Sequence, residues 1–223
     1  MNSVSLVIFL SCILLINSQT FNLIKHDILS ETSGPRCLDG SPAAMYIDIG
    51  AQKDNFMIFF EGGGLCRGDG LNNMLDYCLQ RSTTHLGSSK GYTEKSSFNN
   101  YVFLNPDPKV NPTFHNWTRV FVPYCDGSLH QGFKSSPVVY KGSKLYFRGE
   151  NNTRAHFDYL SKNLKLFSAK KIVVSGTSAG ALATYSWGNY VYNQAVNKNS
   201  VYLIPDSGIF LSDFVNPWNN KTM

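Results

Sequence analysis

The segment Ile172–Gly180 restricts the fold most, because it joins a short apolar run to a tight glycine turn. Ile172-Val-Val-Ser175 is typical of a buried strand, and Gly176-Thr-Ser-Ala-Gly180 follows it directly. The next stretch, Ala181–Ala195, has no proline and predicts a helix. A strand, a tight turn and a helix in this order form a unit of α/β proteins.

Other stretches extend this alternation along the chain. A helical pattern runs from Glu150 to Lys171, with large apolar residues spaced by four and three positions. Residues 82–117 are polar and predict a long surface excursion. Strands that alternate with helices imply a parallel sheet and an α/β class. The further predicted strands are a half-buried one over Ala43–Ile49, buried ones over Phe56–Phe60 and Val120–Tyr124, and a short one over Val201–Ile204.

The composition is that of a globular domain. Of the 223 residues 43% are apolar and only 16% are charged, which excludes a disordered chain, and the length fits one domain. The net charge of +5 is scattered, because Lys170-Lys171 is the only adjacent basic pair. The sequence has no basic stripe with interleaved aromatic residues, so we expect no nucleic-acid partner.

The N-terminus resembles a secretory signal peptide. Val4–Ile16 is almost wholly apolar, no charge precedes Lys25, and Asn17-Ser18-Gln19 offers a cleavage site. We expect a signal peptide over residues 1–18, a secreted extracellular domain over residues 19–223, and no stable membrane insertion after cleavage. An uncleaved anchor is the alternative, although the apolar stretch is short for a membrane span.

Cysteines and glycosylation sequons agree with export. Removal of Cys12 with the signal peptide leaves an even number of cysteines without metal-type spacing, so we expect two disulfides and no metal site. Three pairings are possible, and the preferred one joins Cys37 to Cys125 and Cys66 to Cys78. Three N-glycosylation sequons begin at Asn116, Asn151 and Asn220.

The turn after the predicted strand Ile172–Ser175 has the pattern of a nucleophile elbow. In Gly-x-Ser-x-Gly the serine occupies a strained turn, and small residues on either side avoid a clash with it. Ser178 is therefore the candidate nucleophile, with its hydroxyl raised above the sheet edge at a helix N-terminus. The alternative is an ordinary turn in which Ser178 caps the helix.

A second glycine cluster, Glu61-Gly-Gly-Gly-Leu-Cys66, follows the predicted strand Phe56–Phe60. An acyl-transfer enzyme needs N–H donors for its oxyanion, usually from the residue after the nucleophile and from a glycine-rich loop after an earlier strand. Ala179 and Gly62-Gly63-Gly64 match these two requirements. A phosphate cradle is the alternative, but the loop lacks the Gly-Lys-Ser/Thr ending of a P-loop.

Many sequence blocks, in one order, resemble the pectin acetylesterases of plants and the related animal lipid deacylase Notum. The resemblance extends from about Cys37 to Asp213. The matching blocks are Arg36–Pro42, Phe60–Gly64 with Cys66, His85–Ser89, Asn116-Trp117, Tyr124–Gly127, Leu145–Gly149, Gly176–Gly180 and Asp206–Gly208.

The resemblance implies a secreted serine carboxylesterase with an α/β-hydrolase fold and no metal or cofactor. Ser178 would attack the ester carbonyl, and the N–H groups of Gly63, Gly64 and Ala179 would bind the oxyanion. The implied substrate is an acylated polysaccharide or another acyl ester. Acetyl esters are favoured, because the glycine loop and the Tyr124–Gly127 block look plant-like. We also expect a monomer.

The histidines depart from the resemblance. Hydrolases of this class supply the triad in the order Ser, Asp, His, yet all five histidines precede Ser178. Asp206 is expected to cap a turn near the pocket, with direct catalysis as the alternative. His130 is expected to be exposed or hydrogen-bonded at the surface, with a base role facing the site as the alternative, and His156 is expected to be solvated. We expect the N-terminal part of a single domain whose C-terminal part, with the acid and base, is missing. The alternative is a non-catalytic pseudo-hydrolase that binds acylated glycan or lipid.

Overall fold

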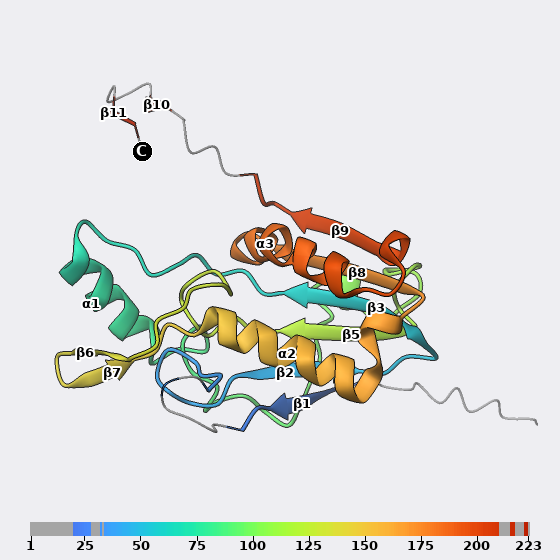
Figure 1. Ribbon diagram of the computed structural model, residues 1–223, viewed down its shortest axis with the longest axis horizontal. Coiled ribbons are helices and arrows are strands. Elements are labelled where there is room, and N and C mark those ends of the chain that lie inside the picture. Colours follow the sequence, from blue (N-terminus) through green and yellow to red (C-terminus); the bar gives the residue numbers. More distant parts are fainter. Residues whose placement is uncertain (1–19, 28–31, 33, 210–214, 217–220, 223) are drawn as a thin grey trace, which may run out of the picture.

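The computed structural model describes residues 20–27, 32, 34–209, 215–216 and 221–222, and its centre is a seven-stranded mixed sheet (Figure 1). The strand order is β4-β1-β2-β5-β3-β8-β9. The strands are β1 (Phe21–Lys25), β2 (Ala44–Asp48), β3 (Gln52–Phe60), β4 (Lys95–Ser96), β5 (Trp117–Val122), β8 (Lys171–Thr177) and β9 (Val201–Asp206).

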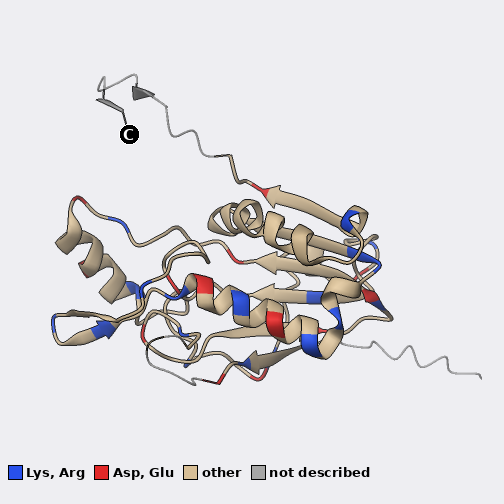
Figure 2. Cartoon of the chain, viewed as in Figure 1, with Lys and Arg blue, Asp and Glu red and all other residues tan. Residues whose placement is uncertain are grey.

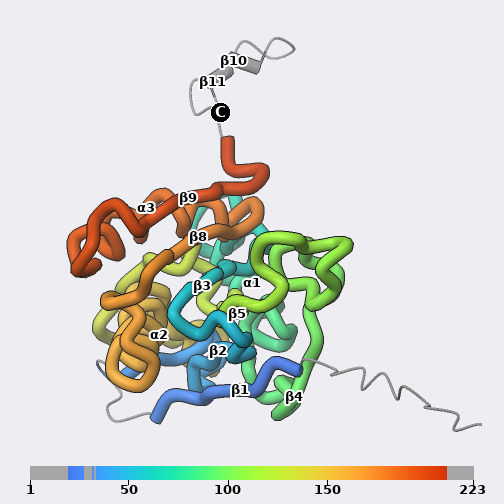
Figure 3. The backbone as a smooth tube through the Cα atoms, turned by 90° about the vertical axis from the view of Figure 1, so that its right-hand side faces the viewer, coloured from blue at the N-terminus to red at the C-terminus, as the bar shows by residue number. Residues whose placement is uncertain are grey.

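Helices α2 and α3 cover one face of this sheet, and the long connection before β5 crosses the other (Figure 3). Helix α1 and a hairpin of β6 and β7 lie beyond the ends of the parallel strands (Figure 1). The bounds are α1 (Leu71–Arg81), α2 (Gly149–Leu164), α3 (Ala179–Gln194), β6 (Val138–Tyr140), β7 (Ser143–Leu145), β10 (Val215–Asn216), β11 (Lys221–Thr222), and the 3-10 turns η1 (Val102–Leu104), η2 (Leu166–Ser168) and η3 (Lys198–Ser200).

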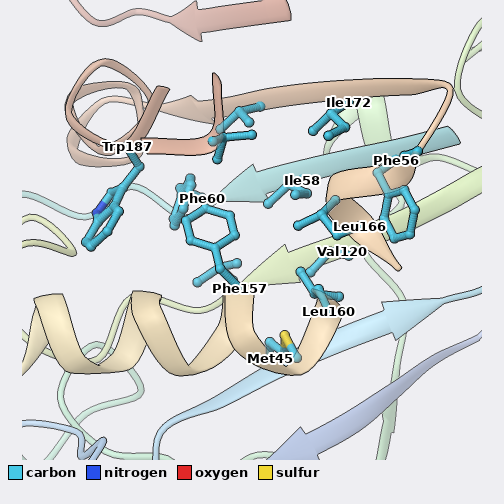
Figure 4. Packing of buried hydrophobic residues seen from close by; sticks show 14 of the residues in the cluster. Met45, Phe56, Ile58, Phe60, Val120, Phe157, Leu160, Leu166, Ile172 and Trp187 are labelled. Atoms are coloured by element: carbon cyan, nitrogen blue, oxygen red, sulfur yellow. The ribbon is translucent and has the colours of Figure 1, made fainter. Parts of the chain in front are cut away.

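The main core lies between the sheet and helices α2 and α3 (Figure 4). Phe56, Ile58 and Phe60 of β3 lie on this side of the sheet, and Phe157 of α2 and Trp187 of α3 belong to the same cluster. The residues between them on β3 are buried on the opposite face. A strand that is covered on both faces is apolar at every position, which explains the continuous apolar run at the end of β3.

The connection between α1 and β5 corrects the expectation of a surface excursion over residues 82–117. It places Leu104 and Phe114 in the core on the second face of the sheet. Phe98 stacks on Phe121 of β5, with ring centroids 4.0 Å apart. Its buried aromatic residues are spaced irregularly within polar sequence, so no regular period reveals them.

The sheet is mixed, whereas the alternation of strands and helices predicted a parallel one. Strands β5, β3, β8 and β9 are parallel, but β2 pairs antiparallel with both β1 and β5. Strand β2 is also buried along its whole length instead of half-buried. Its Asp48 forms an ion pair with Arg119, which has no exposed surface. The sequence patterns did not predict β1, α1 or the hairpin.

Basic and acidic residues are interspersed along the described chain. Figure 2 shows Lys and Arg along α2, on the hairpin and near the strand ends, with Asp and Glu between them. No helix among the described residues is both long and apolar enough to cross a membrane. The expected signal peptide over residues 1–18 and the sequon at Asn220 lie outside the described residues.

Candidate active site

Ser178 lies where β8 ends and α3 begins. Its backbone has φ 55° and ψ −115°, which lies outside the regions that non-glycine residues prefer. The turn therefore has the strained geometry of a nucleophile elbow, in which the serine stands above the carboxyl end of a strand.

Close packing excludes any side chain at the glycines on either side of Ser178. A Cβ atom at Gly180 would lie 2.0 Å from the carbonyl oxygen of Phe60. One at Gly176 would lie 2.4 Å from the carbonyl oxygen of Gly180. Because β8 pairs with β3 at Gly176 and Phe60, the elbow packs directly against the end of the neighbouring strand.

The glycine loop leaves β3 beside this elbow. A Cβ atom at Gly62 would lie 3.2 Å from the Cβ atom of Ser178, so the loop and the candidate nucleophile are close together. Gly63 and Gly64 have φ values of 139° and 70°, which L side chains rarely adopt. Within the described part of the chain, the N–H groups of Gly63, Gly64 and Ala179 have no protein acceptor. No described protein group therefore competes with a ligand oxygen for these three N–H groups.

Asp206 contacts the elbow through its backbone. The N–H group of Ser178 donates to the carbonyl oxygen of Asp206 at 3.1 Å. The carboxylate of Asp206 accepts a hydrogen bond from Ser207 Oγ at 3.0 Å. Asp206 thus contacts the elbow through its main chain, and the expected cap of the turn by its side chain stays a prediction.

His130 is buried, which corrects the expectation of a surface position. It is 2% exposed, and its Nε2 lies 2.9 Å from the carbonyl oxygen of Glu61. A carbonyl only accepts, so Nε2 carries the proton and donates. Burial lowers the pKa of His130 and favours the neutral ring, which stacks on Tyr124 with centroids 4.5 Å apart. The imidazole is thus engaged at the start of the glycine loop.

His156 was expected in solvent, but it is 3% exposed within α2. Its Nδ1 lies 2.7 Å from Nε2 of His26, which is 130 residues away in the sequence. One signal of this burial was present, because His156 precedes the buried Leu160 by one helical turn. The partner of His156 could not be found from spacing.

Glu61 places a half-buried carboxyl at the start of the glycine loop, and no sequence pattern indicated it. Burial raises the pKa of Glu61 to about 7. The N–H group of Tyr124, which donates to Oε2 at 2.8 Å, and the charge of Arg81 both act in the opposite direction. This carboxyl therefore titrates near neutral pH.

Two disulfides hold the segments around the elbow and the glycine loop. They join Cys37 to Cys125 and Cys66 to Cys78, the pairs preferred from the sequence. Cys66 follows the glycine loop and Cys78 lies in α1, so this bridge attaches the loop to the helix. The other bridge attaches the segment before β2 to the loop after β5.

An apolar cavity of about 660 Å³ opens beside the glycine loop. Helix α1 lines it with Leu71, Met74 and Leu75, and the loops add Leu65 and Phe133. A lining of this kind accommodates an apolar group. Among the described residues, no cluster of three or more His, Cys, Asp or Glu side chains is arranged to hold a metal ion.

The asparagines of the two described sequons are half-buried, and the threonines of both sequons are buried. Asn116 lies just before β5, and Asn151 lies in the first turn of α2. Their modification stays a prediction.

Comparison with known proteins gives relatives of two kinds. Pectin acetylesterase 7 of Arabidopsis thaliana is 35% identical over 181 residues, which is 80% of this chain and 43% of the relative. Pectin acetylesterase 5 of the same plant is 30% identical over 191 residues, or 85% of this chain and 42% of the relative. The palmitoleoyl-protein carboxylesterase NOTUM of Schmidtea mediterranea is 27% identical over 171 residues, or 75% of this chain and 30% of the relative. The chain thus spans less than half the length of these curated relatives.

A solved structure, that of the Wnt deacylase Notum from Drosophila, matches with a TM-score of 0.69 and 23% identity over 86% of this chain and 54% of that one. This likeness confirms the α/β-hydrolase fold. The profile of the pectinacetylesterase family matches residues 17–223, which is almost the whole sequence. The chain therefore belongs to the pectinacetylesterase family.

Proposed function

We propose that this chain carries the nucleophile of a secreted serine carboxylesterase, which hydrolyses acyl esters, above all acetyl esters, on polysaccharide or a related acylated substrate. One observation carries the proposal: Ser178 occupies a strained elbow beside a glycine loop in which the N–H groups of Gly63 and Gly64 have no protein acceptor in the described chain. The names of the relatives, pectin acetylesterases and palmitoleoyl-protein carboxylesterases, support a carboxylic ester as the substrate.

In this mechanism the Oγ atom of Ser178 attacks the ester carbonyl carbon and forms a tetrahedral intermediate. The N–H groups of Gly63, Gly64 and Ala179 donate to its oxyanion, where negative charge develops. The N-terminus of α3 adds a favourable dipole at the same place. Collapse of the intermediate releases the alcohol and leaves an acyl-serine, which water hydrolyses to the carboxylic acid.

The attack also needs a base that removes the proton of Ser178. None of residues 179–223 is a histidine. The buried imidazoles of His130 and His156 are already engaged in hydrogen bonds, to the carbonyl oxygen of Glu61 and to His26. These two hydrogen bonds are the observation that favours a second candidate function, a non-catalytic protein that binds acylated glycan or lipid beside the same loop.

Secretion belongs to the same proposal, with a signal peptide over residues 1–18 and the N-terminal part of a single, monomeric α/β-hydrolase-type esterase domain over residues 19–223. The apolar N-terminal sequence and the two disulfides support it, because structural disulfides persist in oxidising compartments.

A fluorophosphonate probe separates the two candidates, because it labels only an activated serine. We expect the full chain to be labelled at Ser178, with the modified peptide identified by mass spectrometry. Ser178→Ala should abolish labelling, whereas Ser186→Ala, which removes an exposed serine of α3, should retain it. A folded chain that binds acetylated pectin but takes no label would favour the binding protein.

Turnover of p-nitrophenyl esters of increasing acyl length, followed by acetylated pectin, tests the substrate. We expect the highest kcat/KM with acetyl esters. A preference for long acyl chains, which the apolar cavity beside Leu65 could hold, would replace the acetyl assignment.

A further inference from the structure

We propose that Arg81 is a positioning residue for the glycine loop, which fixes the peptide between Gly63 and Gly64 so that the Gly64 N–H group faces the oxyanion. This inference rests on the proposed esterase function, because it concerns the same oxyanion donors. It assigns Arg81 no contact with the substrate.

Arg81 reaches the loop from the last turn of α1. Its Nη1 donates to the carbonyl oxygen of Gly63 at 2.7 Å, and its Nε donates to the carbonyl oxygen of Leu86 at 2.9 Å. The guanidinium carbon lies 4.6 Å from the centroid of the Tyr124 ring. Since Arg81 is only 5% exposed, these contacts hold the side chain in a single place.

The geometry of the peptide bond transmits this contact to the next residue. A peptide unit is planar and trans, so its C=O and N–H groups point in opposite directions. A carbonyl of Gly63 that is bound to Arg81 therefore turns the N–H group of Gly64 away from Arg81. That N–H group has no protein acceptor within the described chain.

The loop needs such a contact because its glycines do not select an orientation themselves. Gly63 and Gly64 both have positive φ, and glycine adopts positive and negative φ about equally readily. Rotation of the peptide between them is therefore opposed mainly by the bonds to its oxygen. A charge-assisted hydrogen bond in a buried site is stronger than a neutral one, which makes a buried arginine effective in this position.

A second contact holds the start of the loop. His130 donates to the carbonyl oxygen of Glu61, and the ring of Tyr124 contacts both His130 and Arg81. The backbone N–H group of Tyr124 donates to the carboxylate of Glu61. His130 thus holds the carbonyl group of Glu61, and Arg81 holds that of Gly63. Both side chains pack on Tyr124, but of the two only Arg81 binds one of the three consecutive glycines.

The test compares Arg81→Met and Arg81→Lys with the wild-type full chain. Arg148→Met is the matched control, because Arg148 is also a buried arginine that donates to a carbonyl, that of Ser135 at 2.6 Å. The measurements are the second-order rate of fluorophosphonate labelling at Ser178, kcat and KM for p-nitrophenyl acetate, thermal unfolding, and a crystal structure of each Arg81 variant.

We expect Arg81→Met to lower the labelling rate and kcat by about 100-fold, near the loss of one oxyanion donor, with KM changed less than about twofold. The labelling rate and kcat of Arg81→Lys should fall by about tenfold. Lysine keeps the positive charge and one donor nitrogen, but it lacks the planar guanidinium that binds the carbonyl groups of Gly63 and Leu86 together. Arg148→Met should label at the wild-type rate once unfolding is accounted for. The Gly63 carbonyl should be rotated in the structure of Arg81→Met.

A wild-type labelling rate in folded Arg81→Met would overturn the inference. If the methionine variant does not fold, a wild-type labelling rate in Arg81→Lys would overturn it. An unchanged orientation of the Gly63–Gly64 peptide in the crystal structures would also overturn it. Failure of the proposed function looks different, because the wild-type chain itself would then take no label. The orientation of the peptide in the variants would still decide the role of Arg81 in that case.

Discussion

The imidazoles of half-buried His26 and buried His156 meet, with 2.7 Å between Nε2 of His26 and Nδ1 of His156. His26 follows β1 and His156 lies in α2, so the pair connects a strand near the edge of the sheet to the helix that covers it. A hydrogen bond between two imidazole nitrogens needs one donor and one acceptor. The arrangement therefore requires at least one neutral ring, and protonation of both rings would break it.

The first prediction is a loss of stability in acid. Burial lowers the pKa of His26 from 6.5 to about 4 and that of His156 well below its usual value. The negative charge of Asp27 raises the pKa of His26 and so opposes this shift. His130 lowers the pKa of His156 further. Tyr159 contacts the His26 ring. Between pH 6.5 and about 4 the unfolded chain binds more protons, so the contribution is complete above pH 6.5 and falls as the pH drops.

Urea unfolding at pH 7.5 and pH 4.5 measures this loss. His26→Gln should reduce the difference between the two free energies of unfolding by on the order of 2 to 3 kcal/mol. His85→Gln replaces an exposed histidine and should leave the difference as in the wild type. Equal pH dependence in wild type and His26→Gln would contradict the prediction.

The second prediction concerns the half-buried carboxyl of Glu61, whose pKa is raised to about 7 by burial. Between pH 4.5 and 7 the folded chain binds more protons than the unfolded chain, so this group costs stability as the pH rises. Glu61→Gln keeps an acceptor for the Tyr124 N–H group and removes the ionisation. It should be more stable than wild type at pH 8 by about 1 to 3 kcal/mol, and this advantage should shrink at pH 5. A variant less stable than wild type at pH 8 would show that the charge of Glu61 stabilises the fold.

The elbow could be predicted from sequence because its signals are local. The strand, the glycine spacing and the helix all lie between Ile172 and Gln194, and each strand of the parallel part contains a short apolar run. The proximity of the glycine loop to Ser178 followed from the requirement for oxyanion donors, not from any measure of distance.

The features that escaped prediction depend on long-range contacts. The antiparallel edge is set by pairing between β1 and β2, which no short motif encodes. The pairing of His26 with His156 and the contact of Arg81 with Gly63 join residues far apart in the chain. Arginine is mostly exposed and histidine is intermediate in burial, so residue type alone does not indicate these contacts.

The third prediction tests the close packing at the elbow. Gly180→Ala would bring a Cβ atom within 2.0 Å of the Phe60 carbonyl oxygen, so β3 and β8 must separate there. We expect a loss of at least about 3 kcal/mol in the free energy of unfolding, or no folded protein. Gly91→Ala is the control, because a Cβ atom at Gly91 meets nothing within 4 Å, and its effect should stay within about 0.5 kcal/mol. Similar stabilities of the two variants would contradict the packing.

The fourth prediction separates the two disulfides by the lengths of chain they close. Cys37 and Cys125 are 88 residues apart, whereas Cys66 and Cys78 are 12 apart. In the chain-entropy account the longer loop loses more freedom in the unfolded state, so serine substitution of the first pair should cost about 4.5 kcal/mol and of the second about 3 kcal/mol. Chemical unfolding under non-reducing conditions measures both losses of stability.

The Cys66 bridge attaches the glycine loop to α1. Its removal should therefore also slow fluorophosphonate labelling of Ser178 more than removal of the Cys37 bridge does, when the rates are compared at equal folded fractions. The opposite order of labelling rates would mean that the loop is held by Arg81 and His130 without help from the bridge.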